Sequence, residues 1–561
     1  MNNLIKLFSI ALLVSPLGIQ AKSPTKAQCV DYVIVGGGTA GCVLARLLSD
    51  NFNNKVVMLE RGQNYINDPL IEVCSQGVLE DIFTNPKYSE NFYARNQIIG
   101  SFPVANGRML GGSLAHNRYL FVRGDQSFDD WADFSGDNRW RLANTLPLEI
   151  ANETYIPAGT ISSPLRGTSG PLRITQTAPA RFPFAENLAK ILGAPLVDDY
   201  NITDLATSTA QLFCSEVNGA FTRSFTAKAY LGDVINQDGT SIGKRQLTVK
   251  LGATGTRIIF DNKKATGVEF VVKGQSGREN VCRVLAKKKI ILCSGSFYTP
   301  QLLMLSGVGP KKVLEENNIP KVLVNEHVGA HLSIHYGIVG TFSGDFPGGP
   351  FVSFFNTTTP QGPSRDSQFI VLPGIGGGGG AGSNPSSCIT TLAGTTEATP
   401  RAVIGWLLFP RSKGNVVLAN TNPFTNPFVT FNGYTDGGLD DPNSDASRVV
   451  KFFKLMREAA QSVGGESLFP NPADYESDEK LFEDAQISPT YANHYAGTCR
   501  MARTAHGENG GVVNGKLEVF GLQNLMIADL SVAPKDPAGN PASAACVIGL
   551  EAGRILGATI P

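Results

Sequence analysis

The sequence has no excess of charge of one sign. Its 48 Lys and Arg residues balance 48 Asp and Glu residues, so the formal net charge at pH 7 is zero. A partner such as nucleic acid is usually held by a strongly basic surface. The balance therefore predicts that no nucleic acid or other acidic polymer is a partner.

The cysteine and histidine patterns typical of metal and redox centres are also missing. Nine cysteines occur singly, without a Cys-x-x-Cys pair, and because nine is odd at least one thiol has no partner within the chain. One or two disulfides are compatible with the sequence, but several cysteines lie in apolar segments, where they behave as small core side chains. The six histidines show no metal-ligand spacing. We therefore predict no metal site.

The apolar run at the start of the chain is too short for a membrane span, which needs about 20 apolar residues. Within Met1–Ala21, Lys6 precedes the apolar core Leu7–Val14, and Pro16 interrupts its far end. This arrangement is typical of a secretory signal peptide cleaved after Ala21. We expect residues 1–21 to be removed and the mature protein to be secreted or periplasmic, without a stable membrane span. An uncleaved membrane anchor is the alternative.

The chain is long enough for more than one domain. Its 561 residues exceed what one hydrophobic core usually organises. The 61 glycines and 33 prolines indicate many turns, as in a mixed α/β enzyme. We therefore expect two domains.

A glycine-rich turn near the start of the mature chain carries a clear binding signal. The apolar run Tyr32–Val35 predicts a buried strand, and Gly36-Gly37-Gly38-Thr39-Ala40-Gly41 follows it with G-x-G-x-x-G spacing. A helix is expected at Ala40–Leu48 and a second strand at Lys55–Leu59. This order of elements predicts an adenine dinucleotide and does not separate NAD from FAD.

Each residue of this unit has an expected role. Gly36 permits a tight turn, Gly38 lets the backbone approach a pyrophosphate, and Gly41 lets the helix pack closely on the strand. The N-terminus of the helix offers free N–H groups and a positive dipole end to the phosphates. Glu60 lies about 20 residues beyond the glycines, where an acid can bind ribose hydroxyls.

Motifs further along the chain resemble one enzyme family. The segment GRMLGGSLAHNRYLFVRG at 107–124 is similar to the first signature of the glucose–methanol–choline (GMC) oxidoreductases, and GSFYTPQLLMLSGVG at 295–309 fits the second signature at every specified position. Four further segments resemble the family and keep its order: GAFTRSFTAKAYL at 219–231 lies between the two signatures, and PRSKG at 410–414, HYAGTCRM at 494–501 and GNP at 539–541 follow them. The resemblance covers nearly all of the mature chain. These flavoenzymes bind FAD, so the resemblance favours FAD over NAD.

The resemblance also implies the fold. The expected class is α/β, with a Rossmann-like FAD-binding domain and a discontinuous α+β substrate-binding domain built on an antiparallel sheet. The FAD-binding domain would comprise residues 28–150, 206–310 and 490–561, and the substrate-binding domain residues 151–205 and 311–489. Val403–Leu408 and Asn415–Leu418 are expected strands of the antiparallel sheet.

The sequence also predicts one further helix and one glycine-rich loop. Thr299 before Pro300 predicts a helix whose first position is the proline, and Gly307 would end that helix. The glycine run GIGGGGGAG at 374–382 is either a surface linker or a mobile loop at the substrate entrance.

The flavin site follows from the same resemblance. Asp529, at the end of the strand-like segment Gly521–Ala528, would approach the phosphate or the ribityl chain of the flavin, or alternatively cap the end of its strand. The expected cofactor-binding residues are Gly36, Gly38, Thr39, Ala40, Gly41, Glu60, Arg61, Arg108, Gly111, Gly112, His116, Asn117, Asp529, Asn540 and Pro541.

Two residues match the catalytic positions of the family. Oxidation of an alcohol by a flavin needs an acceptor for the hydroxyl proton and a path for hydride to flavin N5. His494 matches the first catalytic position, and a neutral imidazole suits proton abstraction near neutral pH. Asn540 matches the second position, where the family uses His or Asn. Because Asn540 precedes Pro541, it is also a good candidate for a helix N-cap, and both roles can hold together.

His116 has a possible second role. It lies four residues after Gly112, near the offset at which choline oxidase carries its flavin covalently on a histidine. A non-covalent histidine over the flavin is the alternative. With Asn540, this makes the site pattern most similar to members that resemble choline oxidase and choline dehydrogenase.

These observations predict an exported, FAD-dependent oxidoreductase that acts on the CH–OH group of a small or medium primary alcohol. Oxygen or another electron acceptor would complete the cycle. The alternative is an enzyme similar to hydroxynitrile lyases on the same fold, with FAD that takes no redox part. Asn540, in place of the second His of the lyase branch, argues against that alternative.

Overall fold

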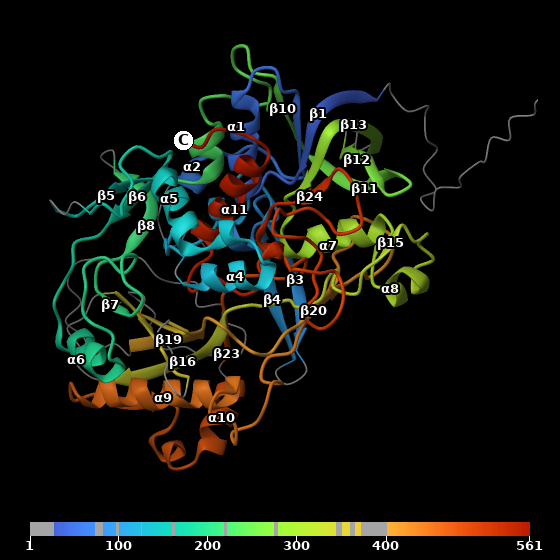
Figure 1. Ribbon diagram of the computed structural model, residues 1–561. Coiled ribbons are helices and arrows are strands. Elements are labelled where there is room, and N and C mark those ends of the chain that lie inside the picture. The colour runs from blue at the N-terminus through green and yellow to red at the C-terminus, as the bar shows by residue number, and fades with distance from the viewer. Residues whose placement is uncertain are drawn as a thin grey trace, which may run out of the picture.

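The computed structural model contains two large sheets, one mostly parallel and one antiparallel (Figure 1). It describes residues 27–72, 82–96, 100–124, 126–159, 163–217, 221–273, 279–343, 350–358, 365–371, 401–487 and 489–561. The predicted signal peptide at 1–21 and the glycine run at 374–382 lie outside the described residues. The predicted fold class, a Rossmann-like unit with a separate antiparallel sheet, is confirmed.

The mostly parallel sheet has the strand order β10-β2-β1-β13-β12-β11, with β24 paired to β13. The strands β10, β2, β1, β13 and β24 run parallel, and β12 and β11 extend the sheet as antiparallel neighbours. Parallel strands are covered on both faces and are therefore apolar, and Val33, Ile34 and Ile290 are fully buried. The bounds are β1 Gln28–Val35, β2 Val56–Glu60, β10 Leu247–Leu251, β11 Ala253–Asp261, β12 Lys264–Lys273, β13 Glu279–Leu292 and β24 Leu525–Ile527.

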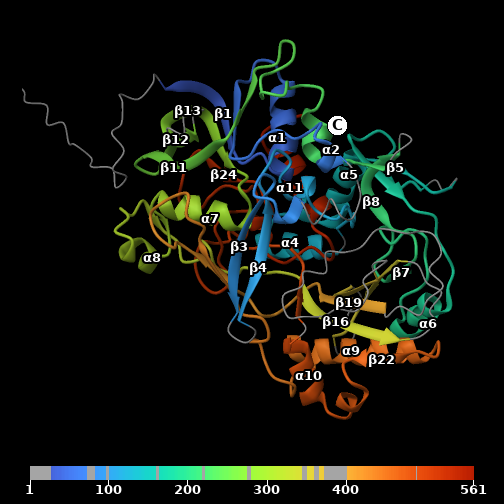
Figure 2. The ribbon, with the colours of Figure 1, turned by 180° about the vertical axis from the view of Figure 1, so that it is seen from behind.

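The helix after the glycine-rich turn packs against the C-terminal helix. These helices, α1 (Thr39–Asp50) and α11 (Ala542–Ile555), lie side by side in both views (Figures 1 and 2). A Cβ atom on Gly549 would lie 2.8 Å from the carbonyl oxygen of Ala40, so the glycine permits this close approach. Because α11 directly follows Pro541, the contact ties the GNP segment to the glycine-rich turn.

The second large sheet is antiparallel and has the order β22-β16-β19-β18-β17-β7, with β23 paired to β16. The helix α9 (Asp445–Gln461) packs on it, and α10 (Asp478–Ile487) and α6 (Pro183–Leu192) pack against α9, on the side away from the parallel sheet (Figures 1 and 2). The strands β7 and β23 come from ranges predicted for the FAD-binding domain, so this sheet draws on both sets of ranges. The bounds are β7 Ala206–Ser208, β16 Tyr336–Ser343, β17 Phe351–Phe355, β18 Ser367–Val371, β19 Arg401–Leu407, β22 Glu466–Phe469 and β23 Pro489–Tyr491.

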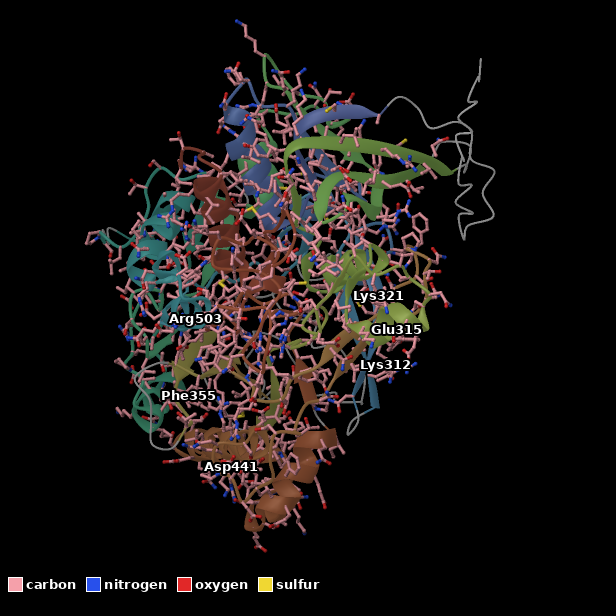
Figure 3. The ribbon with its side chains drawn as sticks, turned by 45° about the vertical axis from the view of Figure 1, so that its right-hand side comes forward. Lys312, Glu315, Lys321, Phe355, Asp441 and Arg503 are labelled. Atoms are coloured by element: carbon pink, nitrogen blue, oxygen red, sulfur yellow. The ribbon has the colours of Figure 1, made fainter. Side chains whose placement is uncertain are left out.

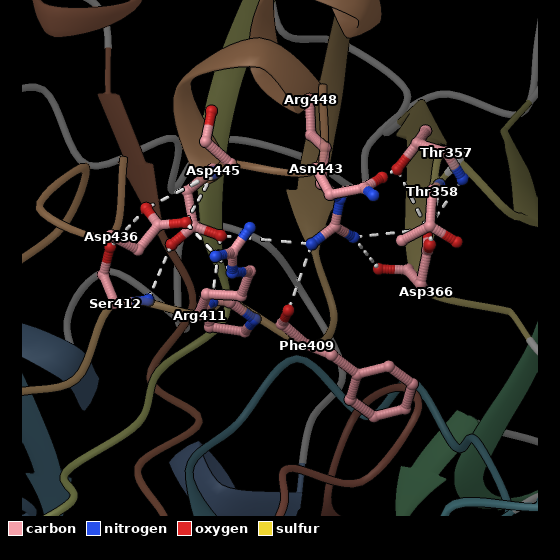
Figure 4. Close-up of polar contacts among 12 residues, drawn as sticks. Thr357, Thr358, Asp366, Phe409, Arg411, Ser412, Asp436, Asn443, Asp445 and Arg448 are labelled. Carbon is pink, nitrogen blue, oxygen red and sulfur yellow. Dashed lines mark hydrogen bonds and ion pairs between the residues drawn. The ribbon is translucent and has the colours of Figure 1, made fainter. Parts of the chain in front are cut away.

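A buried arginine fixes α9 to the sheet (Figure 4). Arg448 donates to the hydroxyl of Thr357 at 3.0 Å and to the carbonyl oxygens of Phe409 at 3.0 Å and Asp366 at 2.9 Å. Its Nη2 atom also lies 3.2 Å from the carboxylate of Asp366. Burial acts to raise the pKa of Asp366, but Arg448 and hydrogen bonds lower it overall. Removal of Arg448 would therefore leave a buried charge without its partner.

The remaining strands of the described residues form two four-stranded sheets and one parallel pair. Their orders are β20-β21-β3-β4, β5-β6-β8-β9 and β14-β15. The prediction that residues 415–418 belong to the large antiparallel sheet is wrong, because β20 pairs with β21 instead. The predicted strand at 403–408 is confirmed except for its last residue, because β19 spans Arg401–Leu407 at the centre of that sheet. The bounds are β3 Ser89–Asn96, β4 Gly100–Gly107, β5 Glu153–Ile156, β6 Leu172–Gln176, β8 Leu212–Val217, β9 Phe221–Arg223, β14 Val308–Gly309, β15 Leu323–Val324, β20 Asn415–Val417 and β21 Phe428–Phe431.

The helix α7 (Gly295–Leu305) begins earlier than predicted. Pro300 lies inside it rather than at its first position, so that prediction is wrong. A proline inside a helix removes the hydrogen bond to the carbonyl four residues earlier. That carbonyl, on Ser296, instead accepts a hydrogen bond from the hydroxyl of Thr498 at 2.6 Å. The tertiary contact makes the internal proline tolerable.

The remaining helices are short and surround these sheets. On α8, Glu315 forms an ion pair with Lys321 at 2.6 Å at the periphery of the molecule (Figure 3). Among the described residues, no helix combines the length and apolar character that crossing a membrane requires. The bounds are α2 Pro69–Glu72, α4 Ser127–Ser135, α5 Leu142–Asn152, α8 Lys311–Glu316, η1 Gly112–Ala115, η2 Asn138–Trp140, η3 Ala227–Leu231, η4 Pro472–Glu476 and η5 Leu530–Val532.

Among the described residues, no cysteine forms a disulfide. Most are buried in the core, as expected of small apolar side chains, namely Cys42, Cys214, Cys293, Cys499 and Cys546. Cys74 and Cys388 lie outside the described residues.

Candidate functional site

A cavity lies between the two large sheets, where the parallel strands end. Its wall includes Val35 and Glu60, at the carboxyl ends of β1 and β2, and the first residues of α1. From the antiparallel sheet come Ile404 and Trp406 of β19. In open parallel sheets, ligands bind in the crevice beyond the carboxyl ends of the strands. The cavity therefore has the expected location of a dinucleotide site.

The three glycines of the turn have different surroundings. Gly36 has a φ of +104°, and a Cβ atom on it would lie 2.4 Å from the carbonyl oxygen of Cys293, so the turn needs glycine. A Cβ atom on Gly41 would lie 2.2 Å from the carbonyl oxygen of Gly36. A Cβ atom on Gly38 would meet nothing nearer than 3.7 Å, and this residue lines the cavity. The space beside Gly38 is therefore open to a ligand.

The second glycine pair closes against this turn. The N–H group of Gly111 donates to the carbonyl oxygen of Gly37 at 2.7 Å. A Cβ atom on Gly112, which has a φ of +58°, would lie 2.8 Å from the Cα atom of Gly38. The two motifs, in which Thr39 and Gly111 are 72 positions apart, thus form one continuous wall of backbone.

Glu60 lies in the same wall and is buried. Its Oε2 atom accepts the N–H group of Gly37 at 2.7 Å, and its Oε1 atom accepts that of Gly62 at 2.6 Å. Burial raises the pKa of this carboxyl, although both hydrogen bonds oppose the rise. Each oxygen of a carboxylate has a second acceptor site, so Glu60 can hold the turn and also accept a hydroxyl from a ligand.

The two predicted arginines differ in position. Arg61 lines the cavity, with its guanidinium 3.9 Å from the ring centre of Tyr298 and 3.5 Å from Glu90. Its Nη2 atom has no hydrogen-bond partner among the described residues. Arg108 lies 3.7 Å from the same Glu90 and is not part of the cavity wall.

Asp529 joins the end of β24 to two helices. Its Oδ2 atom accepts the N–H group of Gly295 at 2.9 Å and the hydroxyl of Thr299 at 2.6 Å, and its Oδ1 atom accepts the N–H group of Ser531 at 2.9 Å. Burial raises the pKa of Asp529, and these bonds oppose the rise. The side chain therefore caps the starts of α7 and η5 rather than the end of its own strand, and it also lines the cavity, where the resemblance predicts contact with the flavin.

Most of the predicted cofactor-binding residues share this cavity. Gly41 and Gly111 contact the turn from behind the wall, and Arg108 pairs with Glu90 instead. The predicted residues in the wall are Gly36, Gly38, Thr39, Ala40, Glu60, Arg61, Gly112, His116, Asn117, Asp529, Asn540 and Pro541.

The predicted catalytic residues meet in the cavity. The Nε2 atom of His494 lies 3.3 Å from the Nδ2 atom of Asn540, and both residues line the cavity. His494 follows β23, and Asn540 ends the loop before α11. Burial, and secondarily His335, lowers the pKa of His494. Its imidazole is therefore neutral near pH 7 and can accept a proton.

Asn540 does not cap α11. The cap position is Pro541, and no side chain there accepts an N–H group. The side chain of Asn540 is directed instead to His494 and to Gln368, whose Nε2 atom lies 3.5 Å from its Oδ1 atom. The N-cap hypothesis is therefore wrong, because the tertiary partners hold the amide.

Three residues near His494 were not predicted. The ring of Trp406 lies 5.8 Å from that of His494 at an angle of 76°, and Gln368 is opposite Trp406 in the register of β18 and β19. Tyr491, the last residue of β23, also lines the cavity. Among the described residues, the indole N–H of Trp406 and the hydroxyl of Tyr491 have no hydrogen-bond partner. Strand register decides which side chains face the cavity, and no motif in the sequence marks it.

His116 is buried in the wall, with its Nε2 atom 3.4 Å from the hydroxyl of Ser89 and its ring centre 4.8 Å from that of Phe83. Its Nδ1 atom has no hydrogen-bond partner among the described residues. Burial, followed by the charge of Arg223, lowers the pKa of His116 to about 4. The imidazole is therefore neutral at pH 7.

The wall fits a flavin dinucleotide. The first turn of α1 has no acidic residue and no side-chain cap, so its N–H groups and positive dipole end are available to phosphates. Gly38 leaves open space beside that terminus, and the guanidinium of Arg61, 3.5 Å from Glu90, adds a positive charge to the wall. Among the described residues, no group of three or more His, Cys, Asp or Glu side chains is arranged to hold a metal ion.

The chain is similar to known proteins over almost its full length. A chloroplastic fatty acid photodecarboxylase from Chlamydomonas reinhardtii is 27% identical over 601 aligned positions, which cover 96% of this chain and 92% of the relative. The GMC oxidoreductase family protein Mala s 12 from Malassezia sympodialis is 27% identical, with 90% of this chain and 88% of the relative covered.

Solved structures share the fold. Pyridoxine 4-oxidase from Mesorbium loti superposes with a TM-score of 0.73 at 24% identity, covering 94% of this chain and 98% of that chain. A formate oxidase gives a TM-score of 0.74 at 22% identity, covering 95% and 98%. A fungal aryl-alcohol oxidase gives 0.71 at 20% identity, covering 94% and 98%. At these identities the likeness shows the fold alone, and the variety of names resolves no subfamily.

The family is shown by direct sequence matches. Residues 30–337 match the N-terminal profile of the GMC oxidoreductases, and residues 410–549 match the C-terminal profile. Together these matches contain the glycine-rich turn, His116, His494 and Asn540. The chain therefore belongs to the GMC oxidoreductase family and is an FAD-dependent oxidoreductase.

Proposed function

We propose that the protein oxidises the CH–OH group of a small or medium primary alcohol. The observation that carries this proposal is the pair formed by His494 and Asn540. A neutral imidazole nitrogen and an amide nitrogen lie 3.3 Å apart in the cavity that the glycine-rich turn also lines. One side chain can take a proton from an oxygen while the other donates a hydrogen bond to it.

The two side chains have different roles toward the alcohol. Asn540 Nδ2 donates to the alcohol oxygen and orients it, and His494 Nε2 accepts the hydroxyl proton. Burial keeps His494 neutral, so it is in its proton-accepting form at neutral pH. When bound, FAD supplies the hydride acceptor at its N5 position.

The cofactor would be held by the residues of the wall. The N-terminus of α1 and the backbone at Gly38 would bind the pyrophosphate, and Glu60 would bind a ribose hydroxyl. His116 and Asn117 would contact the flavin ring. We also propose that His116 carries the flavin covalently, since its position and Asn540 together match the choline-oxidase pattern.

The wall around His494 supports a substrate with an apolar body. Ile404, Leu120 and Trp406 give this part of the cavity an apolar lining. The rings of Trp406 and Tyr491 also line the cavity and add aromatic surface to it. Apolar walls with a few placed polar groups are usual for small-molecule sites.

The test is an anaerobic panel of primary alcohols, including choline and aryl alcohols, added to the purified flavoprotein. Bleaching of the flavin band by an alcohol supports the proposal, and the same addition to a His494→Ala holoprotein is the control. Cleavage of a cyanohydrin without bleaching by any alcohol would instead support the lyase alternative. Repetition with oxygen then separates an oxidase from a dehydrogenase that needs another acceptor.

Export of the protein remains a proposal based on Met1–Ala21. Expression of the full chain in a secreting host should give a mature N-terminus at residue 22, measured by intact mass. Retention of residues 1–21 in a membrane fraction would support the anchor alternative.

A further inference from the structure

A second histidine lies behind His494. His335 is fully buried, immediately precedes β16, and is not among the residues that line the cavity. Its Nδ1 atom lies 3.0 Å from the Nδ1 atom of His494, and the two rings are nearly perpendicular at 87°. His335 can therefore act on a substrate only through His494.

The backbone fixes this contact. The strands β16 and β23 pair with Tyr336 opposite Tyr491, and the ladder continues where the N–H group of Ala492 donates to the carbonyl oxygen of His335 at 2.9 Å. The N–H group of His494 in turn donates to the carbonyl oxygen of Ala492 at 2.7 Å. These backbone hydrogen bonds next to the paired strands therefore fix the positions of both histidines.

The two contacts of the His494 ring indicate which of its nitrogens carries the proton. The oxygen of Asn540 faces the amide nitrogen of Gln368, so its Nδ2 donors face His494 Nε2, which must then be the acceptor. A neutral imidazole carries one proton, so this proton lies on Nδ1. The Nδ1–H group of His494 then donates to the Nδ1 atom of His335.

His335 is suited to accept that hydrogen bond. The carbonyl groups of Pro537 and Leu408 favour a proton on its ring, although its Nε2 atom reaches normal hydrogen-bond geometry with neither. With its own proton on Nε2, the Nδ1 atom is an acceptor. Burial first lowers the pKa of His335, to about 3, and the charge of Lys413 also acts in this direction. Lys413 lies 3.9 Å from the carboxylate of Asp536, and His335 remains neutral beside this pair.

We propose that His335 is a positioning residue that fixes the tautomer of His494, with the proton on Nδ1 and with Nε2 as the unprotonated nitrogen that faces Asn540 in the cavity wall. This inference rests on the proposed role of His494 as the base. A neutral acceptor orients the ring without adding a negative charge to the site. When His494 takes a proton, the same hydrogen bond becomes charge-assisted and stronger.

Two substitutions at His335 test whether the site needs a hydrogen-bond acceptor there or only a side chain of similar shape. In His335→Asn, an amide oxygen can occupy the position of Nδ1 and accept the same hydrogen bond. In His335→Leu, a methyl group occupies that position and accepts nothing. The matched control is His331→Asn, because His331 forms a second histidine pair with His327 at 3.0 Å, away from the cavity wall, and its φ of +60° suits asparagine.

The direct measurement is the solid-state ¹⁵N spectrum of histidine-labelled, FAD-loaded protein without substrate. The six histidines of the chain make assignment practical, and the signal of His494 is identified by its loss in His494→Gln. We expect a protonated Nδ1 on His494 in the wild type, in His335→Asn and in His331→Asn, and a mixture of tautomers in His335→Leu. A wild-type signal from the opposite tautomer overturns the proposal, and this result does not depend on any variant folding.

Flavin reduction by an alcohol gives the second measurement. His335→Leu should lower the rate about tenfold, the worth of one hydrogen bond of about 1.4 kcal/mol, and change its pH profile, whereas His335→Asn should restore both. Equal rates and pH profiles in His335→Leu and the wild type, with equal FAD content, would overturn the proposal. If no alcohol bleaches the flavin but the tautomer is as expected, the proposed function fails and the role of His335 in orienting His494 stands.

Discussion

The Nε2 atom of His494 lies 3.3 Å from the amide nitrogen of Asn540, although 46 residues separate them in the chain. Two separate parts of the fold bring these residues together. Pairing of β23 with β16 holds the segment of His494, and packing of α11 on α1 holds the segment of Asn540. The site therefore joins the antiparallel sheet to the dinucleotide unit, and each of its two residues can be tested separately.

The first prediction concerns the proposed base. His494→Ala should lower the rate of flavin reduction by roughly 10² to 10⁴, because a positioned acid–base group usually contributes that much. Stopped-flow reduction under anaerobic conditions measures it, with FAD content verified first. The exposed His506 lies outside the cavity wall, so His506→Ala is the control. A His494→Ala protein that reduces its flavin at the wild-type rate would refute the assignment.

The second prediction concerns Asn540. Asn540→Ala should lower the rate roughly ten- to a hundredfold by removing one donor to the alcohol oxygen. Its free energy of unfolding should change by less than about 1 kcal/mol, because no capping bond of α11 is lost. Asn540→Asp should raise the pKa of His494, since a carboxylate favours the imidazolium. An unchanged pH profile in Asn540→Asp would contradict the contact.

The dinucleotide unit could be predicted because local rules determine it. The strand at 32–35, the helix after Gly38 and the strand before Glu60 follow from apolar runs and glycine spacing, and the structure has all of them. Asn540 shows where local rules fail. An asparagine before a proline is a good N-cap by itself, but His494 and Gln368 hold its side chain elsewhere.

The other differences between the predicted and the observed structure also result from tertiary contacts. Pro300 is tolerated inside α7 because Thr498 donates to the carbonyl of Ser296, 202 positions away, which the proline leaves without a partner. His335 and Trp406 reach His494 through the register of the antiparallel sheet, and a one-residue shift would turn both away. Register across distant strands leaves no trace in a single sequence.

The third prediction concerns the cofactor site. Gly38→Val should leave the fold intact, because a Cβ atom there meets nothing nearer than 3.7 Å, but its branches would enter the space proposed for the pyrophosphate. The ratio of flavin to protein absorbance should fall to near zero, while the circular dichroism remains that of the apoprotein. Gly438→Val is a matched control, since a Cβ atom on Gly438 meets nothing within 4 Å and this residue lies away from the cavity wall. Full FAD loading of Gly38→Val would place the cofactor elsewhere.

The fourth prediction concerns pH and stability. Burial lowers the pKa of His116 to about 4, whereas an unfolded histidine titrates near about 6.5. Between these values the unfolded chain binds more protons, so stability is full above about 6.5 and falls as the pH falls toward 4. The slope is at most about 1.4 kcal/mol per pH unit for this histidine.

Because burial raises the pKa of Glu60 and Asp529, these acids act in the opposite direction. The measurement is therefore a difference between variants. Unfolding of the FAD-saturated wild type and of His116→Gln is followed from pH 7 to pH 4.5. The wild type should lose more stability than the variant over this range, and parallel curves would show that His116 is not held neutral.

The last prediction concerns a bond between His116 and the flavin. The contact of Gly112 with Gly38 brings the backbone of the first GMC signature against the glycine-rich turn, and η1 then carries the chain to His116 within the cavity wall. The imidazole in this wall is neutral, and a bond to the flavin needs an unprotonated ring nitrogen. A bond to a methyl carbon at the dimethyl edge would replace one C–H bond of the flavin and one N–H bond of the imidazole and would leave the flavin reduced by two electrons, which oxygen or another electron acceptor would remove. The bond would hold the ring and make it a stronger oxidant. Precipitation of the holoprotein with acid should leave the flavin in the pellet, and His116→Ala should release it while FAD stays bound in the native fold. If all of the flavin of the wild type is found in the supernatant, His116 contacts the ring without a bond.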